Sequence, residues 1–259
     1  MAQNEDGALA PEVCFLPARL KIRSLFVACG RASRRLLSVW VVTALAIFLH
    51  QSAAAQAPPA PTARFVVVLD AAHGGDDSGG RFKSGQTEKA FTLGLSVRLR
   101  SLLSARGISV VTTRESDAAV DPNRRAEIAN HANAEACLSL HASETGSGIH
   151  LFASSLAPAA PARFAAWKTA QSASVTRSLA LAGVLNSSLQ HAGMTVTLDR
   201  TALPVVDSMT CPAIAVEIAP ERISGKQVKS ALDDPAYQTR VASALAAALL
   251  EWRTEAHQP

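Results

Sequence analysis

The sequence predicts a single α/β domain with a mostly parallel, twisted sheet of about six strands and helices on both faces. Strand-forming runs alternate along the chain with amphipathic helical stretches, as in parallel sheets that are joined by crossover helices. The run 65–70 is apolar and β-branched almost to its end, which is typical of a strand buried on both faces. No repeat or internal break interrupts residues 65–255, so we assign them to one domain.

Each expected element has a local signal. Between the first two strands, Thr87 is expected to cap a helix whose apolar stripe begins at Phe91, and Gly107 is expected to stop it. The later runs have the lengths and apolar patterns of alternating strands and helices. The expected strands are 65–70, 108–113, 136–140, 148–152, 194–198 and 213–217, and the expected helices are 87–105, 123–131, 175–192 and 237–252.

The chain carries a net charge of +4, and most of it lies near the N-terminus. Residues 1–57 contain six arginines and lysines against three acidic residues, which leaves a net charge of only +1 for the rest. A protein that binds nucleic-acid backbones needs a basic face. The nearly neutral folded part therefore predicts no nucleic-acid partner.

Residues 1–55 have the layout of an export signal with a long basic n-region. An Arg-Arg pair precedes a 14-residue apolar run, 36–49, which suits a signal h-region better than a bilayer span of about 20 residues. An A-x-A site follows at 53–55, so cleavage would leave Gln56 first, at the start of an Ala/Pro-rich linker, 56–64. We expect an exported protein, periplasmic or extracellular. The alternative is an uncleaved anchor that attaches the protein to the inner membrane through 36–49.

Two cysteines, Cys137 and Cys211, lie in the folded part. Both begin apolar strand-like runs, and neither has the CxxC spacing of a metal site. Two cysteines do not make a disulfide scaffold, so buried thiols are the expected state. A bridge between them is chemically allowed outside the cytoplasm and stays open as the alternative.

Four ionisable side chains are expected to meet at the carboxyl edge of the sheet, where open α/β sheets bind ligands. His73 lies in a glycine-rich turn three residues past the first strand, and His141 directly follows the third strand. Glu217 ends the last strand, and Glu88 opens the helix that returns from the first loop. Two histidines, one carboxylate and a position open to water form the ligand set of a catalytic zinc, with the second carboxylate available as a general base.

Each of these residues also has a simpler explanation when it is considered alone. Glu88 could serve only the helix dipole, and a histidine after a buried strand could be a hydrogen-bonded loop residue. Glu217 is harder to explain in this way, because an ionised carboxylate that ends an apolar run needs a partner. The four residues together favour a metal site. We expect His131 to be solvated and His150 to be packed in a strand, so neither is a candidate ligand.

Six short motifs occur in order over about residues 65–255. They are Val68-Leu69-Asp70-Ala71-Ala72-His73-Gly74-Gly75, Glu88-Lys89, Val111-Thr112-Thr113-Arg114, Arg125-Ala126-Glu127-Ile128-Ala129-Asn130, Leu138-Ser139-Leu140-His141-Ala142 and Ala215-Val216-Glu217. This series resembles the zinc-dependent N-acetylmuramoyl-L-alanine amidases, which cut bacterial cell wall. The resemblance implies that His73, Glu88 and His141 bind one zinc ion and that Glu217 is catalytic.

The resemblance also implies a reaction. The expected chemistry is hydrolysis of the amide bond between the lactyl group of N-acetylmuramic acid and L-alanine, with peptidoglycan as the partner. Export agrees with this substrate, because peptidoglycan lies outside the membrane. Two alternatives stay open: a catalytically impaired peptidoglycan-binding protein, and an exported zinc peptidase on the same scaffold.

Overall fold

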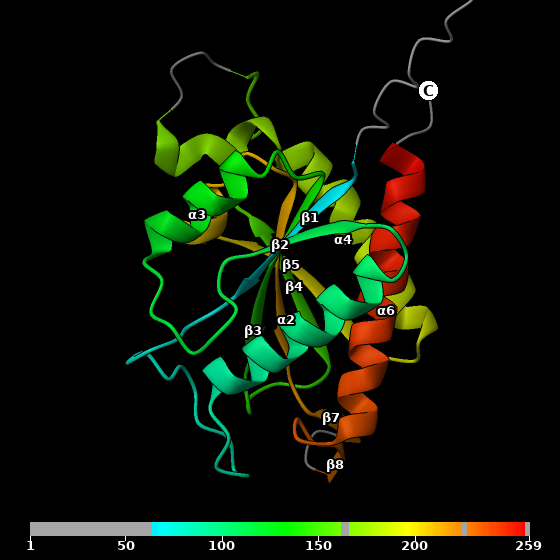
Figure 1. Cartoon of the computed structure of the whole chain (residues 1–259). Coiled ribbons are helices and arrows are strands. Elements are labelled where there is room, and N and C mark those ends of the chain that lie inside the picture. Colours follow the sequence, from blue (N-terminus) through cyan, green and yellow to red (C-terminus); the bar gives the residue numbers. More distant parts are fainter. Residues whose placement is uncertain (1–63, 162–165, 224–226, 257–259) are drawn as a thin grey trace, which may run out of the picture. The chain divides into compact units, whose positions relative to one another are not determined.

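The computed structural model describes residues 64–161, 166–223 and 227–256, and a six-stranded sheet lies at the centre of this part (Figure 1). The strand order is β2-β1-β3-β6-β4-β5, which confirms the expected α/β class and six-stranded sheet. The strands are β1 (Val66–Ala71), β2 (Ser109–Thr112), β3 (Ala136–Ala142), β4 (Ile149–Ser154), β5 (Val196–Thr201) and β6 (Ala213–Ile218), with a separate hairpin of β7 (Glu221–Ile223) and β8 (Gln227–Ser230).

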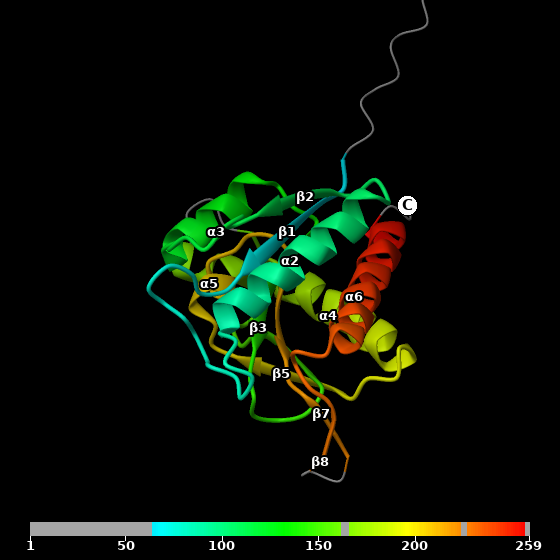
Figure 2. The same ribbon diagram turned by 60° about the horizontal axis from the view of Figure 1, so that its bottom comes forward.

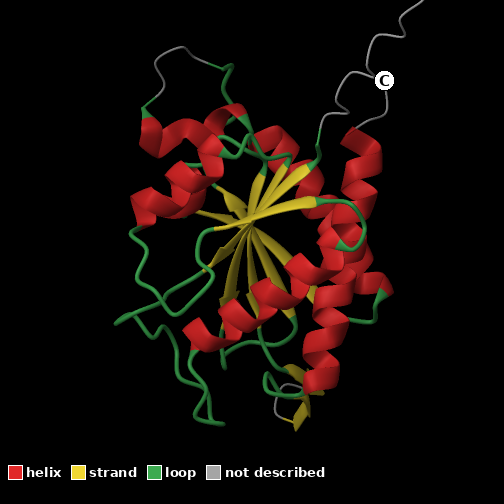
Figure 3. Cartoon of the chain, viewed as in Figure 1, coloured by secondary structure: helices red, strands yellow, loops and turns green. Residues whose placement is uncertain are grey.

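Helices cover both faces of the sheet (Figure 3). Three long helices, α2, α4 and α6, pack on one face, and Figure 2 shows α2 and α6 side by side. The opposite face is covered by α3, by the short helix α5 and by a 3-10 helix, η1. The bounds are α2 (Glu88–Ser104), α3 (Pro122–His131), η1 (Trp167–Ala173), α4 (Val175–His191), α5 (Pro204–Asp207) and α6 (Pro235–Ala256).

The two faces of the sheet bury cores of different size. Leu69 and Leu140 point into the larger core, with α2, α4 and α6. Val68 and Cys137 point into the smaller core, with α3 and α5. Because successive side chains of a strand alternate between faces, Asp70 follows Val68 onto the side of the smaller core. Polar residues near the carboxyl ends of the strands therefore gather on this second face.

The strand β4 is the exception to the parallel arrangement. It runs antiparallel to β6 and parallel to the edge strand β5, whereas β2, β1, β3 and β6 run parallel to one another. The register pairs His141 with Glu217 across β3 and β6, and it pairs Glu217 with His150 across β6 and β4. Three polar side chains are thus neighbours in one row across the sheet.

The bounds of all six strands of the sheet differ from the sequence-based expectation, by at most three residues at either end. The third strand continues to Ala142, so His141 lies within it rather than after it. Pairing with β6 causes this extension, because Ala142 lies opposite Ile218. The weak strand expected at 194–198 is found as β5, which begins and ends later.

Three short elements were not expected from the sequence, namely η1, α5 and the β7–β8 hairpin. The helix α5 has four residues, and the hairpin strands have three and four, which is too short to show a helical or strand period. The η1 segment is held by tertiary contacts instead. The buried Gln171 amide donates hydrogen bonds to the carbonyl oxygens of Met209 and Cys211.

A disulfide joins Cys137 and Cys211, so the expectation of two buried thiols is wrong. Both residues are buried, and their Cα atoms lie 6.2 Å apart, within the usual range for a bridge. The pairing of β3 with β6 brings them together, because Cys137 lies opposite Ala213, two residues after Cys211. A separation of 74 residues hid this proximity in the sequence.

Replacing both cysteines with alanine (Cys137→Ala and Cys211→Ala) is expected to lower the free energy of unfolding by about 2–4 kcal/mol, because the bridge restricts a long loop in the unfolded chain. For a domain of this size, the melting temperature should fall by roughly 2–4 °C for each kcal/mol. Thermal unfolding followed by circular dichroism measures the change. Reductant should lower the melting temperature of the wild type and leave that of the double variant unchanged. Equal melting temperatures for both oxidised proteins would contradict the stabilising role.

The expected signal or anchor, 1–55, lies outside the described residues, and so does the linker up to residue 63. Among the residues that the structure does describe, no helix is long and apolar enough to span a bilayer.

Candidate metal centre

The structure brings His73, Glu88 and His141 together at the carboxyl edge of the sheet. One nitrogen or oxygen atom from each residue lies within 4.8 Å of the others. His73 Nε2 is 3.0 Å from Glu88 Oε2, and His141 Nδ1 is 3.2 Å from Glu88 Oε1. Two imidazoles and one carboxylate are the protein ligands of many catalytic zinc sites. Three residues that are far apart in sequence therefore form one group that can hold a metal ion.

The turn after β1 places His73 through an unusual backbone. His73 has a φ of 63°, which non-glycine residues seldom adopt. Gly79 passes close to the same group, with a φ of +60°. A Cβ atom at Gly79 would lie 2.6 Å from His73 Cδ2 and 2.7 Å from Glu88 Oε2. Only glycine therefore fits here, and the backbone of this loop packs directly against two of the candidate ligands.

Asp77 fixes the orientation of the His73 ring. The distance from His73 Nδ1 to Asp77 Oδ2 is 2.8 Å, and a carboxylate only accepts hydrogen bonds, so Nδ1 donates. This hydrogen bond also lowers the pKa of Asp77. In a neutral ring, Nε2 then holds a lone pair and faces a carboxylate oxygen of Glu88. Two acceptors that face each other at 3.0 Å need a proton or a metal ion between them, and a zinc ion meets this requirement.

Glu88 is held as a carboxylate at the start of α2. It is 7 % exposed, and it accepts hydrogen bonds from the backbone amides of Gly80 (2.9 Å) and Ala142 (3.2 Å). Burial opposes its ionisation, but the His141 ring and the two amides outweigh burial and lower the pKa of Glu88 to about 2. Glu88 is therefore negatively charged at physiological pH, as a carboxylate that binds a metal must be.

Glu217 lies beside this group without belonging to it. It is opposite His141 in the register of β6 with β3, and its side chain is half-buried. Among the described residues, only His73, Glu88 and His141 meet the spacing for a shared ion. A carboxylate next to a metal group but outside it has the chemistry of a general base.

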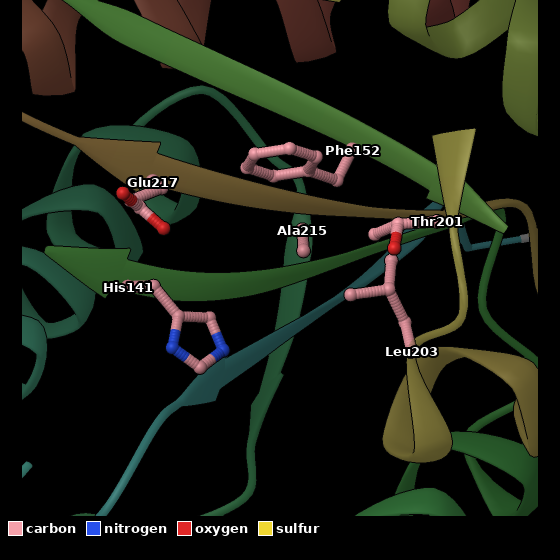
Figure 4. Close-up of a pocket in the computed structure, with 6 residues that line it drawn as sticks. All are labelled: His141, Phe152, Thr201, Leu203, Ala215 and Glu217. Atoms are coloured by element: carbon pink, nitrogen blue, oxygen red, sulfur yellow. The ribbon is translucent and has the colours of Figure 1, made fainter. Parts of the chain in front are cut away.

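Two pockets meet at His141 and Glu217. A polar pocket of about 450 Å³ contains the candidate ligands and extends to Glu144. An apolar pocket of about 270 Å³ lies on the other side, and Figure 4 shows His141 and Glu217 at one end of it, with Phe152 and Leu203 farther along. A substrate that spans both pockets would present a bond between them to the candidate ligands and to Glu217 together.

The two histidines that we did not expect to be ligands lie outside the group. His131 is exposed at the end of α3. His150 is half-buried in β4, where its ring stacks on Phe152 and its Nδ1 lies 2.8 Å from Thr197 Oγ1. Both positions agree with the sequence-based expectation.

Sequence reasoning assigned no role to several residues that support the ligands. Asp77 is one of them. Its position four residues after His73 could have indicated a hydrogen-bond partner for that ring. Arg114 is another: it is buried and donates hydrogen bonds to the carbonyl oxygens of Ala71 and Ala72, just before His73. The sequence did not indicate this role, because Arg114 lies two residues after β2 and its partners are in the distant loop after β1.

Comparisons of the sequence and of the structure with known proteins both identify the same family of proteins. A family model described as N-acetylmuramoyl-L-alanine amidase matches residues 67–251. The germination-specific N-acetylmuramoyl-L-alanine amidase of Bacillus subtilis is 26% identical over 213 residues, which cover 77% of this chain and 84% of that protein.

A shorter match is closer in sequence. N-acetylmuramoyl-L-alanine amidase AmiA of Escherichia coli is 39% identical over 77 residues, which cover 30% of this chain and only 27% of AmiA. Among solved structures, the catalytic domain of the amidase CwlV from Bacillus (Paenibacillus) polymyxa has a TM-score of 0.58 at 26% identity, over 73% of this chain and 98% of that one.

Proposed function

The chain belongs to the N-acetylmuramoyl-L-alanine amidase family, and on this basis we propose that it hydrolyses the amide bond between the lactyl group of N-acetylmuramic acid and L-alanine in peptidoglycan. The observation that carries the proposal is the meeting of His73, Glu88 and His141 within 4.8 Å, beside Glu217 on the neighbouring strand. In this proposal the three residues hold one zinc ion, and residues 65–255 form the catalytic domain.

Glu88 and Glu217 have different surroundings, which suit them to different roles in the proposed reaction. A bound zinc ion supplies a Lewis acid that polarises the amide carbonyl and lowers the pKa of a water from about 15.7 toward 7. Both carboxylate oxygens of Glu88 already contact other groups, namely two imidazole rings and two backbone amides. Glu217 is the carboxylate left free to take a proton from the attacking water and to deliver it to the leaving amine nitrogen. Such a general base contributes roughly 10²–10⁴-fold to the rate.

Two other functions compete with this proposal. A catalytically impaired peptidoglycan binder would not need Glu217, yet the chain keeps it next to the candidate ligands. An exported zinc peptidase on the same scaffold would use the same four residues and cut a different bond. The match of the family model over residues 67–251 favours the amidase.

The deciding experiment is mass spectrometry of purified muropeptides after incubation with the zinc-loaded protein. Release of intact stem peptide from intact glycan is the expected result. Cuts within the peptide would identify a peptidase, and binding without cleavage would identify the impaired binder. A parallel incubation after treatment with a chelator controls for contaminating hydrolases, since that protein should be inactive until zinc is restored.

We also propose that the protein is exported, with residues 1–55 as its signal. The buried disulfide between Cys137 and Cys211 supports this proposal, because disulfides form and persist in oxidising compartments and are rare in the cytosol. The substrate supports it as well, since peptidoglycan lies outside the inner membrane.

The location can be tested by fractionating the native host and sequencing the N-terminus of the recovered protein. We expect the folded protein outside the inner membrane, with Gln56 as its first residue, because the A-x-A site at 53–55 precedes it. Recovery of the full-length chain from the cytoplasm would refute export. Recovery in the membrane fraction with residues 1–55 still attached would refute only the cleavage.

A further inference from the structure

A buried polar network lies directly behind His141, on the face of the sheet that carries α3. Arg125 Nη1 donates to Asp70 Oδ1 (2.7 Å), and the Ser139 hydroxyl donates to Asp70 Oδ2 (2.8 Å). Ser139 Oγ is 3.3 Å from His141 Nε2. Asp70, Ser139 and Arg125 are only 1, 3 and 5% exposed. A chain of hydrogen bonds that is shielded from water thus reaches one ring nitrogen of a candidate metal ligand.

The hydrogen positions in this network follow from the chemistry of its members. Asp70 is a carboxylate that is paired with a guanidinium, and it only accepts hydrogen bonds. Ser139 has a single hydroxyl hydrogen, which it gives to Asp70. The Ser139 oxygen can then only accept from His141, so Nε2 carries the ring hydrogen. Nδ1 is then the nitrogen that can offer a lone pair to a metal, which would take the place of any hydrogen between Nδ1 and Glu88.

That lone pair is directed at the metal group, because His141 Nδ1 is the atom that lies 3.2 Å from Glu88 Oε1. We propose that Ser139 and Asp70, anchored by Arg125, are positioning residues that hold His141 as the Nε2–H tautomer and so present Nδ1 to the metal. This inference rests on the metal site of the proposed function. The opposite tautomer would direct an N–H toward Glu88 and block coordination by His141.

Each of the two candidate histidines then has a carboxylate on the side of its ring that faces away from the metal site. His73 has the carboxylate of Asp77 directly behind it at 2.8 Å, whereas His141 has the carboxylate of Asp70 behind it through a serine. Loss of such a partner behind a metal-binding histidine typically costs 10–100-fold in metal affinity. The Ser139 hydroxyl should therefore matter for zinc binding although it lies on the far side of the ring.

The affinity test compares three variants of the full-length protein by competition for zinc with a chelator of known affinity. Ser139→Ala removes the hydroxyl and should weaken zinc binding by roughly 10–100-fold. Ser139→Thr keeps the hydroxyl and should restore binding, because a cavity of about 180 Å³ beside Ser139 can take the extra methyl group. Thr113→Val is the matched control. The Thr113 hydroxyl also donates to Asp70 (2.7 Å), but to the Oδ1 oxygen that faces away from Ser139, so zinc affinity should stay near the wild-type value.

The tautomer that the network favours can be read from ¹⁵N-edited imidazole NMR spectra of the Glu88→Ala variant, in which neither a metal nor the Glu88 carboxylate acts on Nδ1. The His141 signals are assigned by their loss when His141→Ala is added. We expect the Nε2–H form in Glu88→Ala. Adding Asp70→Asn should reverse it. Arg125 and Thr113 both donate to Oδ1, so the asparagine oxygen stays there and its amide donates to Ser139. The serine hydroxyl would then donate to Nε2 and shift the hydrogen to Nδ1.

The inference is overturned if His141 of Glu88→Ala is in the Nδ1–H form, if folded Glu88→Ala with Asp70→Asn added keeps the Nε2–H form, or if Ser139→Ala binds zinc as tightly as the wild type. Should Asp70→Asn fail to fold, the Ser139 variants still decide. A wild type that binds zinc and cleaves muropeptides, together with an unaffected Ser139→Ala, would reject only this inference. A wild type that does neither would reject the proposed function, and the NMR spectra of Glu88→Ala would still test the tautomer.

Discussion

Replacing Glu217 with glutamine is expected to slow muropeptide cleavage by roughly 10²–10⁴-fold or more, while zinc stays bound. Glutamine has nearly the same volume as glutamate but cannot accept the proton of the attacking water, so the variant loses the general base and little else. Glu217 lies outside the group of three candidate ligands in the described part of the chain, so the metal content should not change. Zinc stoichiometry and cleavage rate, measured on the same preparation, test both parts of this expectation.

Glu144→Gln is the matched control for this experiment. Glu144 is another carboxylate of the polar pocket, and it lies in the loop after β3. If Glu217 is the base, Glu144→Gln should cleave at close to the wild-type rate. Full zinc with undiminished cleavage in Glu217→Gln would remove that residue from the mechanism. Loss of zinc together with activity would make Glu217 a ligand instead.

Replacing any one of His73, Glu88 and His141 with alanine is expected to abolish stable zinc binding, and cleavage with it. Two remaining ligands cannot complete a site that needs three from the protein. The loss of affinity should therefore exceed the roughly 10–100-fold that follows the loss of an outer partner. Elemental analysis after dialysis should find about one zinc per wild-type chain and far less in each variant.

His131→Ala is the control for these ligand variants, because it removes an exposed histidine at the end of α3. Its zinc content and activity should match those of the wild type. Circular dichroism of all four variants separates loss of the metal from loss of the fold. Unchanged zinc in all three ligand variants would show that the assignment is wrong.

The central strands and the meeting of the four site residues could be predicted from the sequence. The run before Asp70 and the run before Glu217 are apolar on both faces, which identifies buried parallel strands. Parallel strands end at the same edge of a sheet, so residues near the carboxyl ends of β1, β3 and β6 had to be neighbours. The prediction needed only the positions of the strands, which long apolar runs indicate well.

The network behind the ligands could not be predicted, because it depends on contacts between distant segments. The bridge between Cys137 and Cys211 requires the register of β3 with β6. The contact of Ser139 with Asp70 requires the register of β1 with β3, which pairs these two residues directly. Each of these residues also has an ordinary role in a strand or loop, so no local pattern distinguishes it.

The register that sets His141 opposite Glu217 also determines how this domain can tolerate insertions and deletions. One residue added to β6 before Glu217 would turn that side chain to the opposite face, into the core under α2, α4 and α6. Two added residues would restore the face but move the carboxylate by about 6.6 Å along the strand, away from its place opposite His141. The number of residues in this strand therefore matters as much as their identity, and changes in chain length can be accommodated only in the loops.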